Sequence, residues 1–130
     1  MPTFLEAAGV PIPSSVDGDS CLPLARGEQA PWREYLHGEH TYRDQSVQYV
    51  TDGRKKYVWF SGDGTEQFFD LVADPQELHD LARDERCTDE VALWRGRLME
   101  ALAGREEGFA DGKALIPGRP VSPCLRSVFG

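Results

Sequence analysis

Cysteine is scarce in this sequence. Its three cysteines, Cys21, Cys87 and Cys124, lie far apart and form no Cys-x-x-Cys pair. An odd number of widely spaced cysteines supports neither a disulfide framework nor a zinc knuckle, so we expect a reducing, cytoplasmic compartment. The sequence also lacks the apolar run of roughly 18 to 20 residues that a membrane span needs, and no basic region followed by an apolar one marks its N-terminus. We therefore expect no membrane partner.

Basic residues are outnumbered, with 14 lysines and arginines against 22 aspartates and glutamates and a net charge of -8. A field of this sign repels phosphate backbones, so a nucleic-acid partner is not expected. The hydrophobic fraction of 40% and the three tryptophans in 130 residues are enough for one small folded domain.

A β-hairpin is the clearest local pattern. Two β-favouring runs, 47–51 and 56–60, flank Asp52-Gly53, a pair that suits a tight hairpin turn. A second turn at 62–64 leads into a third run at 66–71, and 32–37 is a candidate fourth strand that Gly38 to His40 should interrupt. Because Tyr49, Tyr57 and Trp59 all have odd numbers, we expect one face of the sheet to be mainly aromatic before the turn resets the register.

Helical patterns surround these strands. The segment PTFLEAAGV at 2–10 predicts a helix with Pro2 in its first turn and Gly9 at its end, and so abrupt a start suggests a truncated boundary. Asp74-Pro75 predicts a short helix, and Thr88 is the expected cap of a longer one. In the longer helix Val91, Trp94, Leu98 and Leu102 recur at helical spacing up to Gly104.

These elements predict an α+β fold, a small antiparallel sheet of three to four strands covered by a C-terminal helix. We expect three segments: a helix and loop at 1–31, the sheet with its helix at 32–104, and an extended arm at 105–130. In the arm glycine, proline and charged residues dominate, and its apolar residues show no period.

Three groups of residues are candidates for chemistry. His37, Glu39 and His40 are potential metal ligands, but HGEH matches neither HExxH nor HxxEH, so we favour a polar strand end or loop and predict no metal site. Cys21 to Arg26 differs by one residue in spacing from the Cys-x-Pro-x-Arg motif of sulfatases, and we expect an unmodified, buried Cys21 that anchors the loop. We interpret the cations at 54–56 as solvated charges on opposite sheet faces.

Four segments, in order, resemble the C-terminal end of bacterial arylsulfatase-like enzymes of the alkaline phosphatase superfamily. MPTFLEAAGV at 1–10 looks like the family's DIMPTLLxLAG helix, and VDGDSCLPLARGE at 16–28 like its DGxSLLPLLxG loop. YVTDGRKKYVWF at 49–60 is similar to its TDGxYKY hairpin, and FFDLVADPQELHDLA at 68–82 to LYDLxxDPxExxNLA. The sequence departs from these patterns at Cys21, where an apolar residue is usual, and at His79-Asp80, where Asn is common.

The resemblance implies the C-terminal portion of a sulfatase, a scaffold beside the active site that is inactive alone. The family's formylglycine nucleophile and its calcium ligands would precede Met1, so no catalytic residue and no cofactor is assigned to this chain. His37, Glu39 and His40 would be the candidates for a cleft wall. The implied partner is a missing N-terminal sulfatase domain, or a second copy joined through exposed apolar surface.

Two alternatives remain. One is a stand-alone interaction module without enzymatic activity, and the other, the least favoured, is an independent metal hydrolase built on HGEH. The resemblance does not fix the substrate, because related superfamily members cleave phosphonates or phosphate diesters.

Overall fold

The computed structural model describes residues 1–121 except 17, 30–31 and 44. The chain divides into two compact units between Arg33 and Glu34. The first unit holds two short helices, α1 (Pro2–Ala7) and α2 (Leu22–Ala25). Pro2 opens α1 and Gly9, at a φ of 68°, follows its end, so the predicted first helix is confirmed. The Thr3 hydroxyl accepts a hydrogen bond of 3.0 Å from the Cys21 amide, which ties the loop to α1.

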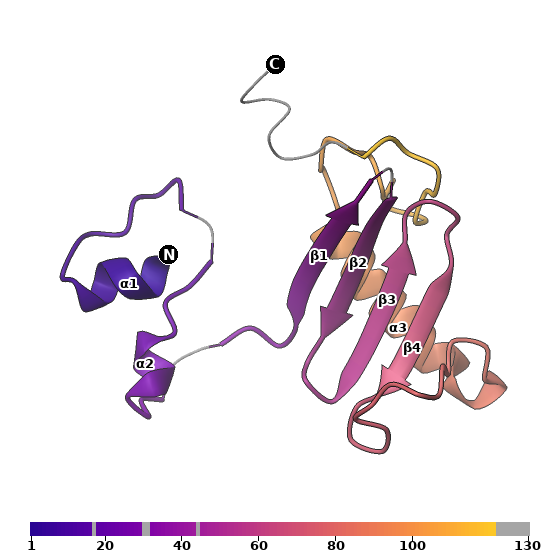
Figure 1. Ribbon diagram of the computed structural model, residues 1–130, viewed down its shortest axis with the longest axis horizontal. Coiled ribbons are helices and arrows are strands. Elements are labelled where there is room, and N and C mark those ends of the chain that lie inside the picture. Colours follow the sequence, from indigo (N-terminus) through magenta and orange to yellow (C-terminus); the bar gives the residue numbers. More distant parts are fainter. Residues whose placement is uncertain (17, 30–31, 44, 122–130) are drawn as a thin grey trace. The chain divides into compact units, whose positions relative to one another are not determined.

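The second unit is built on a four-stranded antiparallel meander (Figure 1). Its strands are β1 (Leu36–Tyr42), β2 (Gln45–Thr51), β3 (Lys55–Phe60) and β4 (Glu66–Asp70), in that spatial order. At the β2–β3 turn the Asp52 carboxylate accepts hydrogen bonds of 2.8 Å from the amides of Arg54 and Lys55. Gly53 has a φ of 83°, a conformation that glycine adopts without strain. The predicted hairpin is confirmed.

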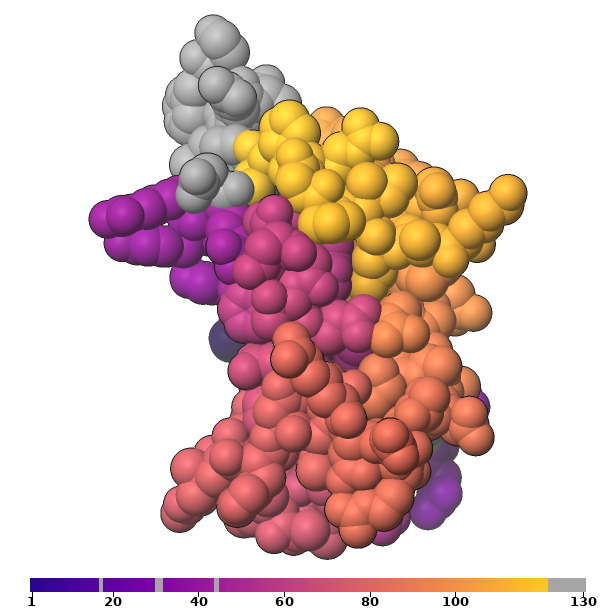
Figure 2. Space-filling view, turned by 90° about the vertical axis from the view of Figure 1, so that its right-hand side faces the viewer, coloured from indigo at the N-terminus to yellow at the C-terminus, as the bar shows by residue number. Residues whose placement is uncertain are grey.

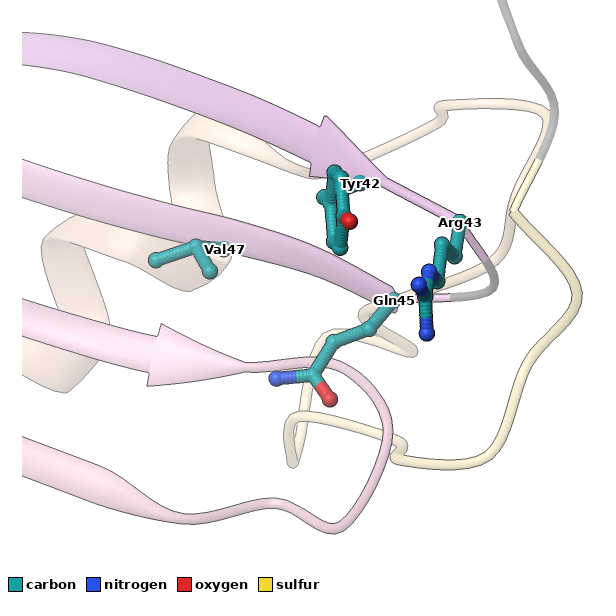
Figure 3. A pocket seen from close by; sticks show the side chains of 4 residues that line it. All are labelled: Tyr42, Arg43, Gln45 and Val47. Atoms are coloured by element: carbon teal, nitrogen blue, oxygen red, sulfur yellow. The ribbon is translucent and has the colours of Figure 1, made fainter.

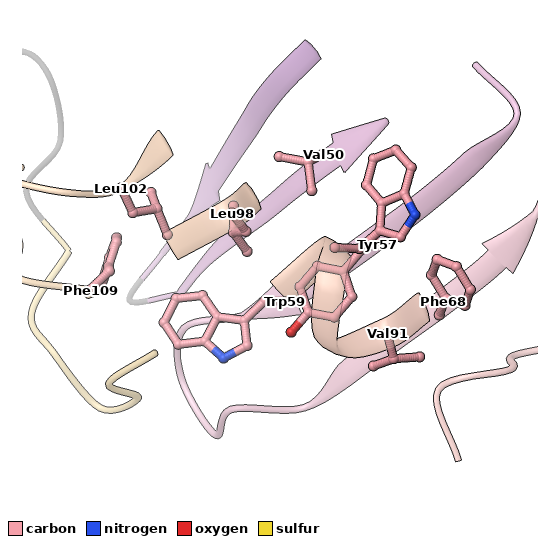
Figure 4. Packing of buried hydrophobic residues seen from close by; sticks show 9 residues of the cluster. Val50, Tyr57, Trp59, Phe68, Val91, Leu98, Leu102 and Phe109 are labelled. Carbon is pink, nitrogen blue, oxygen red and sulfur yellow. The ribbon is translucent and has the colours of Figure 1, made fainter. Parts of the chain in front are cut away.

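One face of the sheet, here called the helix face, is covered by α3 (Thr88–Ala101) (Figure 1). A 3-10 turn, η1 (Glu85–Cys87), precedes α3, and Thr88 is the first residue of the helix rather than its cap. The apolar stripe of the helix packs against aromatic residues of β3 and β4 (Figure 4). The buried cluster consists of Val50, Tyr57, Trp59, Phe68, Val91, Trp94, Leu98, Leu102 and Phe109. The α+β fold with a covering helix is therefore confirmed.

The segment after α3 contributes to this core as well. Phe109 is fully buried and meets Trp59 edge to face, with 5.6 Å between the ring centroids. Ala110 and Leu115 form an antiparallel bridge, and the Gly118 amide donates a 2.8 Å hydrogen bond to the Ser61 carbonyl. Figure 2 shows this segment, in yellow, lying against the β3–β4 end of the sheet.

The first strand differs from the prediction. The predicted strand at 32–37 is wrong, because β1 runs from Leu36 to Tyr42 and includes the Gly38–His40 segment that was expected to interrupt it. Gly38 fits there because the ring of its cross-strand partner Tyr49 takes the place of a side chain; a Cβ on Gly38 would stand 2.2 Å from that ring. Aromatic cover of this kind stabilises a glycine in a strand.

The three aromatic residues Tyr49, Tyr57 and Trp59 do not share one face, because the register changes at the turn. Val50 pairs with Tyr57, and Tyr49 pairs with Val58. Directly paired residues share a face, so Tyr57 and Trp59 lie on the helix face while Tyr49 lies on the opposite one. The hairpin turn reverses the odd and even positions between β2 and β3.

The short helix expected from Asp74 is absent from the described residues, where 71–84 form turns. Glu77 has a φ of 55°, which a helix does not tolerate. The segment instead follows the edge of β4: the Leu81 amide donates to the Phe68 carbonyl at 2.8 Å, and the Asp80 carboxylate accepts from the Phe68 amide at 3.0 Å. Among the described residues, no helix has both the length and the apolar character to cross a membrane.

Candidate functional site

The three candidate residues of β1 do not converge. His37 pairs with Val50 and Glu39 with Gln48, which places both on the helix face. His40 pairs with Val47 and lies on the opposite face, exposed. Alternation along the strand thus separates the two imidazoles. The register brings His37 and Glu39 together and leaves His40 apart.

A buried glutamine links His37 and Glu39. Gln48 is fully buried, and its side-chain amide donates to Glu39 at 3.2 Å and to the Ser46 hydroxyl at 2.7 Å. Its carbonyl oxygen lies 2.8 Å from His37 Nε2. Because an amide oxygen only accepts, His37 carries a proton on Nε2. Ser61 extends the network by accepting from the Ser46 amide at 2.8 Å, so the polar groups of Gln48 are satisfied inside the protein.

This polar network also reaches the segment after α3. The Arg105 guanidinium lies 2.9 Å from Glu39 and 2.8 Å from Glu107. The hydrogen bonds from Arg105 lower the pKa of Glu107, and those to Glu107 raise the pKa of Arg105. Sequence reasoning missed Gln48 and Arg105. The only available signal was a glutamine between Val47 and Tyr49 in a strongly β-favouring run.

The basic cluster at 54–56 divides between the two faces, as the interpretation required, but two of its members are paired rather than simply solvated. Lys55 lies on the helix face, 3.1 Å from Asp70 and 3.3 Å from Glu90. Burial lowers the pKa of Lys55, but the hydrogen bonds to both carboxylates outweigh it and raise that pKa. Lys56 lies on the opposite face and donates to Glu77 at 3.0 and 2.9 Å. Both cations have carboxylate partners within the unit.

Cys21 is exposed, so the expectation of a buried anchor is wrong. It stands at the N-terminus of α2, a helix of four residues. The nearby Arg26 lies 3.9 Å from Glu28. In the part of the chain that the structure describes, no three His, Cys, Asp or Glu side chains gather as a metal site would require. The described residues therefore do not fit the metal that sulfatases hold.

Open hollows on the surface of the second unit include two that are lined by described residues. The first, of about 310 Å³, is lined by Tyr42, Arg43, Gln45 and Val47 at the β1–β2 turn (Figure 3). It combines an aromatic ring and a valine with one guanidinium and one amide. The Arg43 guanidinium lies over the Tyr42 ring, 5.2 Å from its centroid.

The second hollow, of about 340 Å³, lies between the β3–β4 turn, α3 and the segment at 113–117. Its wall contains the Glu66–Arg95 pair, joined by two hydrogen bonds of 2.7 and 2.6 Å. Burial raises the pKa of Glu66, but the hydrogen bonds from Arg95 outweigh it and lower that pKa. The two charges compensate each other, which is the arrangement of a structural ion pair.

The comparisons with known proteins agree in family and in fold. The family model described as N-sulphoglucosamine sulphohydrolase, C-terminal, matches residues 1–103. An arylsulfatase of Clostridium perfringens is 43% identical over 122 residues, which cover 94% of this chain and 25% of that protein. A multifunctional alkaline phosphatase superfamily protein of Trinickia caryophylli is 38% identical, over 81% of this chain and 23% of that protein.

Among solved structures, a 2-O GAG sulfatase matches with a TM-score of 0.73 at 24% identity, over 98% of this chain and 31% of that one. At this identity the likeness concerns the fold alone. The chain spans about a quarter of the length of the curated relatives it matches.

Proposed function

Because the chain belongs to the family of N-sulphoglucosamine sulphohydrolase C-terminal regions, within the alkaline phosphatase superfamily, we propose that it is the accessory C-terminal part of a sulfuric ester hydrolase. In this role it is a scaffold beside an active site whose reactive groups belong to the rest of the enzyme. The 43% identity to an arylsulfatase, over only 25% of that protein, is the observation that carries the proposal.

The pairing of charges within the second unit supports a scaffold. The carboxylates of Glu39, Glu66, Glu77 and Glu107 all meet arginine or lysine at hydrogen-bonding distance. A group that acts as an acid, a base or a nucleophile must instead face the reacting atoms. The family's formylglycine and metal ion supply nucleophilic attack and charge stabilisation in the whole enzyme, and we assign neither to residues of this chain.

The exposed apolar side chains of the first unit support the proposal that it contacts another part of the enzyme. Pro2 is the only buried residue of its two helices, whereas Phe4 is 81% exposed. So small a unit cannot bury enough apolar surface to be stable by itself. We therefore assign to it a contact with the part of the sulfatase that the relatives carry and this chain does not.

Activity measurements on the isolated chain and on a chimera test this proposal. In the chimera, residues 1–130 replace the matching quarter of the C. perfringens arylsulfatase, and the protein is coexpressed with the formylglycine-generating enzyme. We expect the isolated chain to leave an aryl sulfate intact and the chimera to hydrolyse it. A matched chimera with alanine at its formylglycine position controls for contaminating activity. Hydrolysis by the isolated chain, or a soluble chimera without activity, would contradict the proposal.

The alternative, a stand-alone interaction module, is favoured by the same exposed apolar side chains. The isolated chain would then remain monomeric and stable, and grafting it into the relative would restore nothing. Sedimentation of the isolated chain, measured beside the activity of the chimera, separates the two functions.

A further inference from the structure

We propose that the sheet face opposite α3 is the surface on which this unit docks against the catalytic part of the sulfatase. This inference rests on the proposed function and identifies the contact surface. The docking surface, here called the outer patch, consists of the side chains of Leu36, Tyr42, Val47, Tyr49 and Phe60. Their cross-strand pairing places all five on the same face of β1, β2 and β3.

The pattern of polar and apolar residues supports this assignment. An antiparallel sheet with one solvated face normally places its polar residues on that face. Here Ser46 and Gln48 of β2 are buried on the helix face, while Val47 and Tyr49 point to the opposite one. This inversion of the usual pattern indicates that both faces of the sheet are covered in the complete enzyme.

The described residues of the second unit leave part of this face accessible: Val58 and Phe69 on the same face are buried at 6% and 5% exposure, whereas the outer patch is partly exposed. α3 contacts β2 and β3 from the helix face. On the other side, Leu36 and Tyr42 are 45% and 63% exposed, and Val47, Tyr49 and Phe60 are half-buried. Figure 1 shows no other labelled helix of this unit over that face.

Tyr49, at the centre of the patch, is held in place before any partner binds. Its ring lies against Gly38 of β1, where a Cβ would come within 2.2 Å of it. The Lys56 ammonium lies 5.5 Å from the ring centroid and is itself held by Glu77. A rigid aromatic side chain loses little conformational entropy on binding, which is the property of an interface anchor.

The charges around the patch further define the partner. The Glu77 carboxylate is neutralised by Lys56, and the hollow of Figure 3 opens at the patch rim with Arg43 in its wall. We infer a largely apolar partner surface with an acidic side chain that enters this hollow. The occupant is the catalytic part of the enzyme, since about three quarters of the length of the curated relatives lies outside the matched region.

The chimera of the preceding subsection permits a direct test by hydroxyl-radical labelling. Tyr42 and Tyr49 should be oxidised more slowly in the chimera than in the isolated chain. Leu93, 56% exposed on α3, should be oxidised equally in both. An active chimera in which both tyrosines are labelled as fast as in the isolated chain would overturn the docking surface while leaving the proposed function intact. A soluble, inactive chimera would instead contradict the proposed function.

Matched substitutions provide the second measurement. Val47→Asp should reduce the activity of the chimera at least about tenfold, the effect of roughly 1.4 kcal/mol. Leu93→Asp should leave the activity within about twofold. Equal activities of the two variants would argue against the outer patch. If the isolated chain dimerises, and Val47→Asp makes it monomeric without changing the chimera, the occupant is a second copy and the proposal is wrong.

Discussion

Lys56 of β3 donates to both carboxylate oxygens of Glu77, which lies in the turns after β4, at 3.0 and 2.9 Å. The pair joins the segments 49–60 and 68–82, each of which resembles a sulfatase sequence pattern. Glu77 keeps a φ of 55° in this contact. The ion pair thus connects the lysine of the β2–β3 hairpin to the glutamate that follows Asp74-Pro75.

A double-mutant cycle with Lys56→Met and Glu77→Gln measures this contact. Both side chains are partly exposed, so we expect a coupling free energy of about 0.2–1 kcal/mol that decreases in high salt. Urea unfolding of the four proteins provides the values. A coupling near zero at low salt would show that the pair adds nothing to the fold.

Gly38→Ala should destabilise the second unit by about 1–3 kcal/mol, because the added methyl group overlaps the Tyr49 ring. The second substitution Tyr49→Ala removes the overlap, so the double variant should lose less stability than the two single losses predict. Thermal unfolding of the three variants tests this. Additive losses would mean that the ring and the glycine do not compete for space.

Trp94→Ala should cost about 3–5 kcal/mol in free energy of unfolding, because the indole is buried between α3 and the sheet. Leu93→Ala is the matched control on the exposed side of the same helix and should change the stability by less than about 0.5 kcal/mol. Chemical denaturation of both variants decides the outcome. Equal effects would contradict the orientation of α3.

Tyr57→Phe should stabilise the protein by about 1 kcal/mol, because the Tyr57 hydroxyl is buried and has no hydrogen-bond partner among the described residues. Burial, reinforced by the charge of Glu66, also raises the pKa of this hydroxyl. The phenylalanine ring fills the same space without a polar atom to desolvate. A clear loss of stability on urea unfolding would reveal a hydrogen bond to Tyr57.

Acid should weaken the fold partly through Glu66. Its folded pKa lies below the ordinary value of 4.5, so its contribution is complete above that value and is lost as the pH falls through the folded pKa. Glu66→Gln should therefore be less stable than the wild type at neutral pH, and the difference should shrink as the pH falls below 4.5. Urea unfolding across this range tests it. A constant difference would exclude the Glu66–Arg95 pair as the cause.

Local sequence patterns predicted the elements that depend mainly on neighbouring residues or on a regular spacing of apolar residues. The Asp52-Gly53 turn and the Val91 to Leu102 stripe were correct, because turn geometry and helical spacing are fixed by neighbouring residues. The extent of β1 was not predicted, because Gly38 is accommodated by a ring from another strand. The helix expected from Asp74 failed for a similar reason: the contact of Glu77 with Lys56 and the pairing of Leu81 with β4 outweigh the local preference.

The candidate site was predictable only in part. The HGEH pattern indicated candidate residues in β1. Which of their side chains share a face depends on the pairing of β1 with β2. The network around Gln48 joins residues that lie up to 66 positions apart, from Glu39 to Arg105. No local pattern marks such a connection, because its members contact one another only after the sheet has formed.

The burial of Phe109 against Trp59 has a practical consequence for dissecting enzymes of this kind. The family match stops at residue 103, six positions before the phenylalanine that closes the end of the core. A boundary taken from the family model alone would therefore remove Phe109, expose the Trp59 indole and uncover the Leu98–Leu102 end of the helix. The folded core therefore extends beyond the family model, into a segment that the match to the C. perfringens arylsulfatase, at 94% of this chain, still includes.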